Sequence, residues 1–101
     1  MSGGGGAVIS REMGYTADEF IAVLPGAMRD WPVSGGPEFW RVAGVDGGAI
    51  ALIRIQPRPE RVMGSLRLPV LAVTIDLLDV PAALAGEFMR RFDRGFHRGG
   101  G

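Results

Sequence analysis

The sequence predicts an α+β protein, a two-layer sandwich in which two helices cover an antiparallel sheet of three to four strands in the order β-α-β-β-β-α. Three observations predict this fold. A helix-capping signal stands near residue 16, strand-like alternation of apolar side chains fills much of residues 39–77, and apolar residues recur at every fourth position over residues 84–96. Period-two patterns indicate strands, and helical spacing indicates amphipathic helices. Strands gathered between helices in this way are typical of the α+β class.

The length of 101 residues predicts one domain with a single hydrophobic core. We expect the glycine-rich residues 1–6 to be a disordered lead, residues 7–98 to form the single α+β domain, and residues 99–101 to be a disordered tail. Weak alternation over residues 7–13 predicts a short strand at an edge of the sheet.

The clearest local signal opens the first helix. Thr16 at the N-cap, with Glu19 three positions later, forms a capping-box pattern, and Tyr15 and Phe20 are spaced for a hydrophobic staple. Pro25 has no N–H for the bond to the carbonyl four residues earlier, so we expect a kink or a break near residue 24 and a second short turn that runs to about residue 29. The expected buried stripe consists of Phe20, Ile21, Leu24, Ala27 and Met28.

The next segment predicts a loop and a β-hairpin. Residues 31–37 are rich in proline and glycine and are expected to form the loop. The runs 39–45 and 49–55 read as two strands around Asp46 and Gly47, a pair favoured in two-residue hairpin turns. Both faces of this hairpin are partly apolar, which indicates either a central strand or an exposed patch that contacts a partner.

The following segment predicts one long strand with a bend. Residues 56–60 are expected to be an extended connection stiffened by proline. In residues 61–77, apolar side chains fall on even positions before Pro69 and on odd positions after it. Because proline cannot donate to a strand ladder, we expect a bulge or a bend at Pro69.

A second amphipathic helix is predicted at the end of the chain. It is expected to begin at Asp79 or Val80, with Pro81 in the first turn, where a missing N–H costs nothing. Glu87 precedes Arg91 by four positions, a spacing that favours an ion pair on the helix surface. The expected apolar face consists of Leu84, Ala85, Phe88, Met89, Phe92 and Phe96.

The charged residues are unevenly distributed although the net charge is zero. All eleven basic residues are arginine. Residues 1–50 hold three arginines and six acids, and residues 51–101 hold eight arginines and five acids. Such asymmetry can mark a side of the molecule that faces anions. It is also the composition that a GC-rich genome produces.

The composition excludes several kinds of chemistry. Without cysteine or lysine, and with one histidine, the chain cannot form a thiolate metal site, a Schiff base or a Cys–His pair. His97 is expected to be exposed at the end of the last helix. Asp76 and Asp79 are the one conceivable carboxylate pair, and strand-end and N-cap positions explain both. We therefore expect no enzyme activity, no catalytic residue, no cofactor and no metal site.

These observations favour a small non-catalytic accessory or protein-interaction module. The simplest partner would be a second copy of the chain, bound through the hairpin or the edge strand to form a homodimer. Aromatic and arginine side chains are common anchors of interfaces. The expected partner-binding residues are Phe39, Trp40, Ile50, Leu52 and Arg54.

The alternative function is binding of an anion or a nucleic acid through an arginine-rich face. That face would consist of Arg54, Arg58, Arg61, Arg67, Arg90, Arg91 and Arg94. A helix–three strands–helix order also occurs in double-stranded RNA-binding domains, but the second helix here has no positive charge in its first two turns, which argues against nucleic acid. The sequence shows neither a secretory signal nor a membrane-length apolar segment, so we expect a cytoplasmic protein with no membrane contact.

Overall fold

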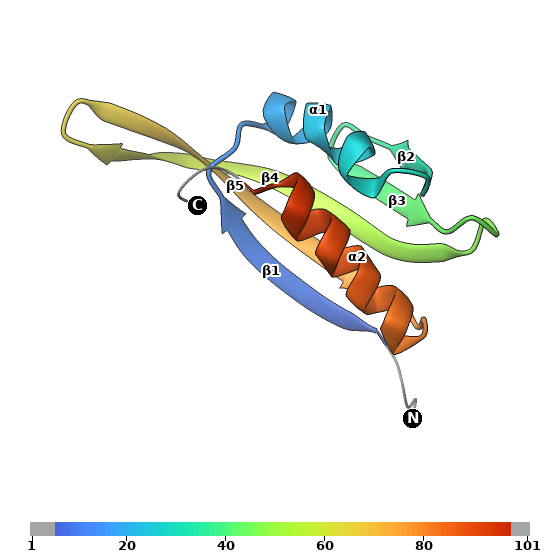
Figure 1. Cartoon of the computed structure of the whole chain (residues 1–101). Coiled ribbons are helices and arrows are strands. Elements are labelled where there is room, and N and C mark those ends of the chain that lie inside the picture. Colours follow the sequence, from blue (N-terminus) through green and yellow to red (C-terminus); the bar gives the residue numbers. More distant parts are fainter. Residues whose placement is uncertain (1–5, 98–101) are drawn as a thin grey trace.

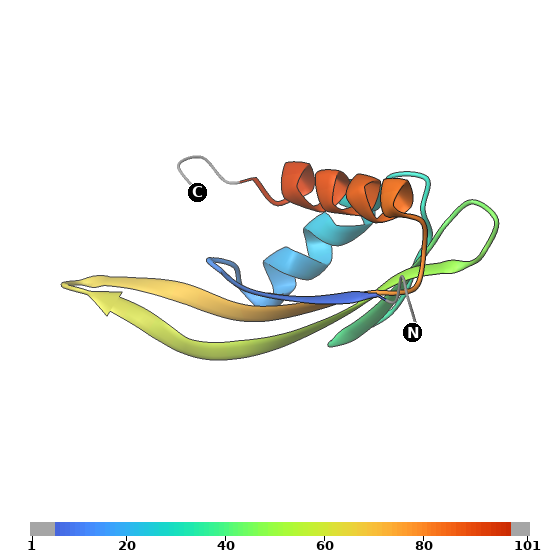
Figure 2. The ribbon, with the colours of Figure 1, turned by 90° about the horizontal axis from the view of Figure 1, so that it is seen from below.

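The computed structural model describes residues 6–97. Their elements are β1 (Ala7–Met13), α1 (Ala17–Met28), β2 (Val33–Gly35), β3 (Phe39–Ala43), β4 (Ala49–Met63), β5 (Leu66–Leu77) and α2 (Ala82–Gly95). The strands form one antiparallel sheet in the order β1-β5-β4-β3-β2. Both helices lie on one face of this sheet (Figures 1 and 2). The predicted α+β class and the antiparallel sheet with two helices are therefore confirmed.

The predicted number and order of strands are wrong. The sheet has five strands rather than three to four, and the element order is β-α-β-β-β-β-α. The additional strand, β2, lies inside the segment predicted to be a loop, where Val33 pairs with Val42 and Gly35 pairs with Trp40. Gly35 has a φ of 108°, and a Cβ there would lie 2.5 Å from the carbonyl oxygen of Phe39. Glycine is thus required at position 35 for the close pairing of β2 with β3. The glycine and proline content of residues 31–37, which predicted a loop, concealed this strand.

The bent strand predicted over residues 61–77 is also wrong. This segment contains the end of β4, a turn at Gly64 and Ser65, and β5, so the predicted connection over residues 56–60 is part of β4. Gly64 has a φ of 61°, which suits a tight hairpin turn. The irregularity lies in β4 between Arg58 and Arg61, opposite Pro69. Because Pro69 cannot donate to the ladder, the bulge falls on the partner strand at this point.

Helix α1 begins as the sequence predicts and continues past the expected break. The Thr16 hydroxyl accepts the Glu19 N–H at 3.1 Å, and the Glu19 carboxylate accepts the Thr16 N–H at 2.9 Å, which completes the capping box. The helix continues through Pro25 to Met28 without a break. The predicted stripe faces the core, with Ile21 only partly buried.

Helix α2 begins at Ala82, later than the predicted start at Asp79 or Val80, and Pro81 occupies its N-cap. The phenylalanines of its apolar face are buried as predicted, and Phe92 and Phe96 pack against Phe20 of α1. The ring centroids of Phe20 and Phe96 are 4.6 Å apart in a stacked arrangement. The predicted pair between Glu87 and Arg91 is present, with Nε to Oε2 at 2.9 Å.

The core fills the space between the helices and the facing side of the sheet. The hairpin between β3 and β4 closes with a five-residue loop over residues 44–48, in place of the predicted two-residue turn. A register shift follows, because Val42 pairs with Ala51 whereas Ala43 pairs with Ala49. Ile50 is the extra residue of this bulge. It therefore joins the core although it is an even number of residues from the exposed Arg54.

Candidate functional site

The sheet face opposite the helices, here called the open face, is not covered by any described element (Figure 2). Three of the five predicted partner-binding residues, Phe39, Leu52 and Arg54, lie together on it. The other two lie in the core, where Trp40 is 5% exposed and Ile50 is 1% exposed. Trp40 alternates with Phe39 along β3 and so faces the helices. The exposed part of the predicted interface is therefore limited to the three residues on the open face.

A shallow hollow of about 280 Å³ lies at the centre of the open face. We call its lining the open-face patch, which consists of Val8, Phe39, Leu52, Arg54, Thr74 and Asp76. The Arg54 guanidinium lies over the Phe39 ring, 4.9 Å from its centroid. Asp76 pairs in register with Val8 on one side and with Leu52 on the other. Within residues 6–97, neither Arg54 nor Asp76 forms an ion pair. The patch thus combines apolar side chains with two opposite charges that have no ionic partner in this part of the chain.

A second uncovered region is the outer part of the β4–β5 hairpin, residues 57–69, here called the arm. It extends beyond both helices as a two-stranded ribbon (Figures 1 and 2). Four large apolar side chains on it are exposed by 41–61%, namely Val62, Met63, Leu66 and Leu68. The sequence does contain a signal for the arm, because Gly64 and Ser65 between two alternating runs are typical of a two-residue hairpin turn.

The predicted arginine-rich face is divided between elements. Arg54, Arg58 and Arg61 lie on β4, Arg67 lies on β5, and Arg90, Arg91 and Arg94 lie on α2. Arg54 is on the open face, whereas α2 covers the other side of the sheet. Arg61 approaches Glu12 and Arg67 approaches Glu60, each at 3.6 Å. The structure therefore does not bring the seven arginines together.

Arg91 has a structural role that ties α2 to the end of α1. Its guanidinium donates to the Met28 carbonyl at 2.7 Å and to Asp30 at 2.8 Å, and it stacks over the Trp31 ring at 3.8 Å from the centroid. Glu87 accepts its Nε–H, and this bond is the main cause that raises the pKa of Arg91. The same interactions lower the pKa of Glu87 and of Asp30. Four of the predicted anion-binding arginines form an ion pair in the described residues. Among these four, Arg91 has the least exposed side chain, at 14%.

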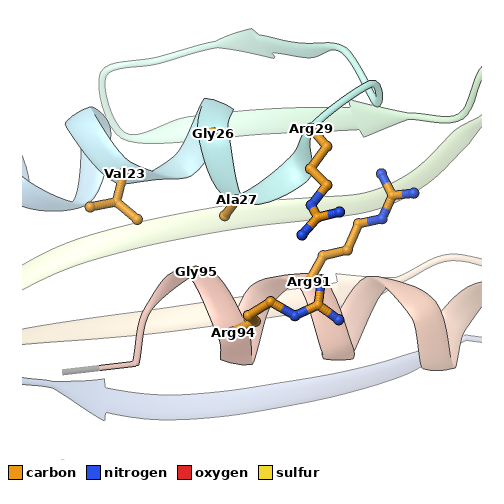
Figure 3. Close-up of a pocket in the computed structure, with 7 residues that line it drawn as sticks. All are labelled: Val23, Gly26, Ala27, Arg29, Arg91, Arg94 and Gly95. Atoms are coloured by element: carbon orange, nitrogen blue, oxygen red, sulfur yellow. The ribbon is translucent and has the colours of Figure 1, made fainter. Parts of the chain in front are cut away.

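A pocket of about 290 Å³ lies between α1 and α2 (Figure 3). It is lined by Val23, Gly26, Ala27, Arg29, Arg91, Arg94 and Gly95. Three arginines border it, and no carboxylate is among the lining residues. Arg29 could not be predicted from the sequence, because it lies in the more acidic half of the chain and belongs to no pattern. Its backbone conformation, with a φ of 58°, also leaves no sequence signal.

Other classes of site are not found in the described part of the chain. Residues 6–97 contain no group of three or more histidine, cysteine or acidic residues placed to hold a metal ion. No helix among them has the length and apolar character needed to cross a membrane. Comparison with protein-family models, with characterised proteins and with solved structures gives no match.

Proposed function

We propose that this chain is a small non-catalytic protein-interaction module that self-associates through the open face of its sheet. The observation that carries the proposal is the open-face patch, where apolar side chains surround two charges without an ionic partner in residues 6–97. Exposed apolar clusters rimmed by polar groups are typical of interaction sites. A charge on such a patch loses hydration on docking, and an opposite charge on the partner offsets that cost.

A second copy of the chain supplies that opposite charge. In a two-fold symmetric interface, a residue that contacts a second residue is contacted by it in return. Arg54 and Asp76 lie on neighbouring strands at diagonal positions, because Arg54 pairs with Thr74. A symmetric partner that sets its Asp76 against Arg54 therefore also sets its Arg54 against Asp76. The patch is self-complementary in charge, and this favours a homodimer over an unrelated protein.

The arm enlarges the same surface. Leu66 and Leu68 are separated from Thr74 and Asp76 by even numbers of residues along the single strand β5, so they belong to the same side of it. Stable interfaces bury roughly 800 Å² on each partner, more than a hollow lined by six residues provides. Burial of the arm's apolar side chains against the second copy supplies the additional area.

Sedimentation velocity over a range of protein concentrations tests this proposal. The wild-type chain is expected to form a dimer, and Leu52→Glu to remain monomeric, because the carboxylate is buried without a partner. Val45→Glu is the matched control, since Val45 is 79% exposed in the loop between β3 and β4 and is not part of the patch. A monomeric wild-type chain at the highest concentration, or a Leu52→Glu variant that still dimerises, contradicts the proposal.

Charge exchange distinguishes a second copy from another protein. Arg54→Asp and Asp76→Arg are each expected to weaken the dimer, because each places like charges together across the interface. The double variant restores the opposite charges, so it is expected to recover the dimer. If both single variants weaken the dimer and the double variant does not recover it, Arg54 and Asp76 do not meet across a two-fold axis.

A further inference from the structure

We infer that the pocket between α1 and α2 binds a phosphate group on a small ligand. This site is separate from the open-face patch, because the helices lie on the other side of the sheet (Figure 2). The inference rests on the charges that border the pocket and on the small residues that line it. It also rests on Gly26 and Arg29, two residues beside the pocket that lower the stability of the fold at their positions.

The charged residues that line the pocket are all arginines, and two of the three form no ion pair within residues 6–97. Figure 3 shows the Arg29 side chain reaching from the end of α1 toward α2, while Arg94 lies along α2. Within residues 6–97, neither Arg29 nor Arg94 forms an ion pair. Asp30 is the acid next to Arg29 in the sequence, and its carboxylate is bound to Arg91 at 2.8 Å. Two guanidinium groups without an ionic partner therefore border a pocket that no carboxylate lines.

Small residues keep the pocket open. Gly26, Ala27 and Gly95 line it, and at Gly26 an added Cβ would meet no atom within 4 Å. At Gly95 an added Cβ would lie 2.2 Å from the Cβ of Ala27, so the two helices touch there. Gly95 is thus explained by helix packing. Gly26 is not, because neither packing nor a positive φ requires glycine at this position inside α1.

Arg29 is the second position where stability is given up. Its φ of 58° and ψ of −116° form a backbone conformation that glycine adopts without steric cost and other residues rarely adopt. Such outliers persist only where the surrounding structure holds them, and they cluster at active sites and ligand-binding sites. Arg94 also suits the C-terminal end of α2, where cations interact favourably with the helix dipole. Arg29 is likewise the C-cap of α1, so its backbone conformation, and not its charge, is what separates it from ordinary helix-end electrostatics.

The chemistry of the pocket favours phosphate. The planar guanidinium group can donate two parallel hydrogen bonds to a pair of oxygens of a phosphate or a carboxylate, and two guanidinium groups together favour a doubly charged group. A volume of about 290 Å³ lies near the lower limit for small-molecule sites, so the phosphate and a short attached group fill it. Inorganic phosphate and O-phosphoserine are suitable probes of this class.

Amide chemical-shift mapping by NMR on the full chain tests the inference. Inorganic phosphate is expected to shift the amides of Val23, Gly26, Ala27 and Gly95, whereas sodium chloride at the same ionic strength leaves them in place. O-phosphoserine is expected to produce the same shifts, and serine none. Equal shifts with chloride or with serine, or phosphate shifts confined to other surfaces, overturn the inference.

Two variants make the test specific to Arg29 and to the pocket. Arg29→Gly accommodates the backbone and removes the guanidinium, so phosphate affinity is expected to fall roughly tenfold or more while the protein stays folded. Gly26→Glu adds a carboxylate that competes with phosphate for the arginines, and it is expected to weaken binding similarly. Arg58→Gln, an exposed arginine of the arm, is the matched control and should bind as the wild type does. Unchanged binding by Arg29→Gly overturns the inference.

Discussion

The inner and outer halves of the β4–β5 hairpin have similar residues and opposite environments. In the inner half, Ile53 and Ile75 are fully buried beneath the helices. In the arm, Val62 is 59% exposed. It pairs with Arg67, which lies an even number of residues from Ile75 along β5, so Val62 is on the same side of the sheet as Ile75. The difference shows that cover by α1 and α2, rather than the hydrophobicity of the strands, decides which apolar residues form the core. Alternation along a strand therefore predicts burial only where another layer covers it.

The largest expected effect compares two truncations on β5. Ile75→Ala leaves a cavity in the core and is expected to lower the free energy of unfolding by about 2–5 kcal/mol. Leu66→Ala removes a side chain that is exposed in the single chain, so at protein concentrations where the chain is monomeric it is expected to change this free energy by less than about 0.5 kcal/mol. Urea denaturation monitored by circular dichroism measures both. Equal losses would mean that the arm is covered in solution, and for Leu66→Ala a loss that grows with protein concentration would assign that cover to a second copy.

The next effect concerns the independence of the arm. Gly64→Val places a β-branched residue at a φ of 61° and is expected to strain the turn by roughly 1–2 kcal/mol. Because the strain falls on a ribbon without a covering layer, the arm is expected to open while the body stays folded. Hydrogen exchange should become faster for amides of residues 57–69 and stay unchanged for Ile53. Faster exchange throughout β4 would show that the arm and the body unfold as one unit.

A third prediction concerns Arg29 beside the pocket, where a substitution is expected to increase the stability of the fold. Arg29→Gly relieves the left-handed backbone and is expected to raise the free energy of unfolding by about 1 kcal/mol, within the range for such strain. Arg29→Ala removes the same side chain and keeps the strain, so it is the control and should leave stability nearly unchanged. Thermal denaturation without phosphate measures both variants. A glycine variant that is no more stable than the alanine variant would show that the conformation is not strained.

The smallest effect is a pH dependence at the junction of α1 and α2. The pKa of Glu87 in the folded chain is lowered from its ordinary value of 4.5, first by hydrogen bonds from Arg91 and then from Arg90. A lowered pKa means that the unfolded chain binds more protons near pH 4.5, so this stabilisation is present above that pH and is lost as the pH falls below it. Glu87→Gln is expected to flatten the loss of stability on acidification, measured by denaturation at several pH values. An unchanged pH profile would show that the ion pair is not maintained in solution.

The parts of the fold that depend on neighbouring residues were predictable from the sequence. The capping box of Thr16 and Glu19 and the phenylalanine stripe of α2 are local patterns, and the structure contains both. The strand β2 and the arm were missed because their form depends on pairing with distant residues. The burial of Ile50 was missed because a bulge reverses the alternation from which its exposure was inferred.

The candidate sites were predictable only in part, for the same reason. Phe39, Leu52 and Arg54 could be grouped because they lie on one hairpin. The seven arginines were grouped by charge alone, and charge does not reveal that Arg54 lies on the open face whereas the three arginines of α2 lie on the other side of the sheet. The proximity of Arg29 to Arg94 depends on how two helices cross, which no pattern in either helix encodes.

The pairing of β1 with β5 carries a consequence for the order of folding. Ala7 pairs with Leu77, so the ladder of β1 cannot form until β5 has been synthesised. Contacts between residues so distant in sequence form late because the intervening loop must close first. The β4–β5 hairpin, whose pairing is local, is thus the natural template, and β1 joins it last. During synthesis β1 therefore stays without its partner strand until residues 71–77 of β5 have emerged.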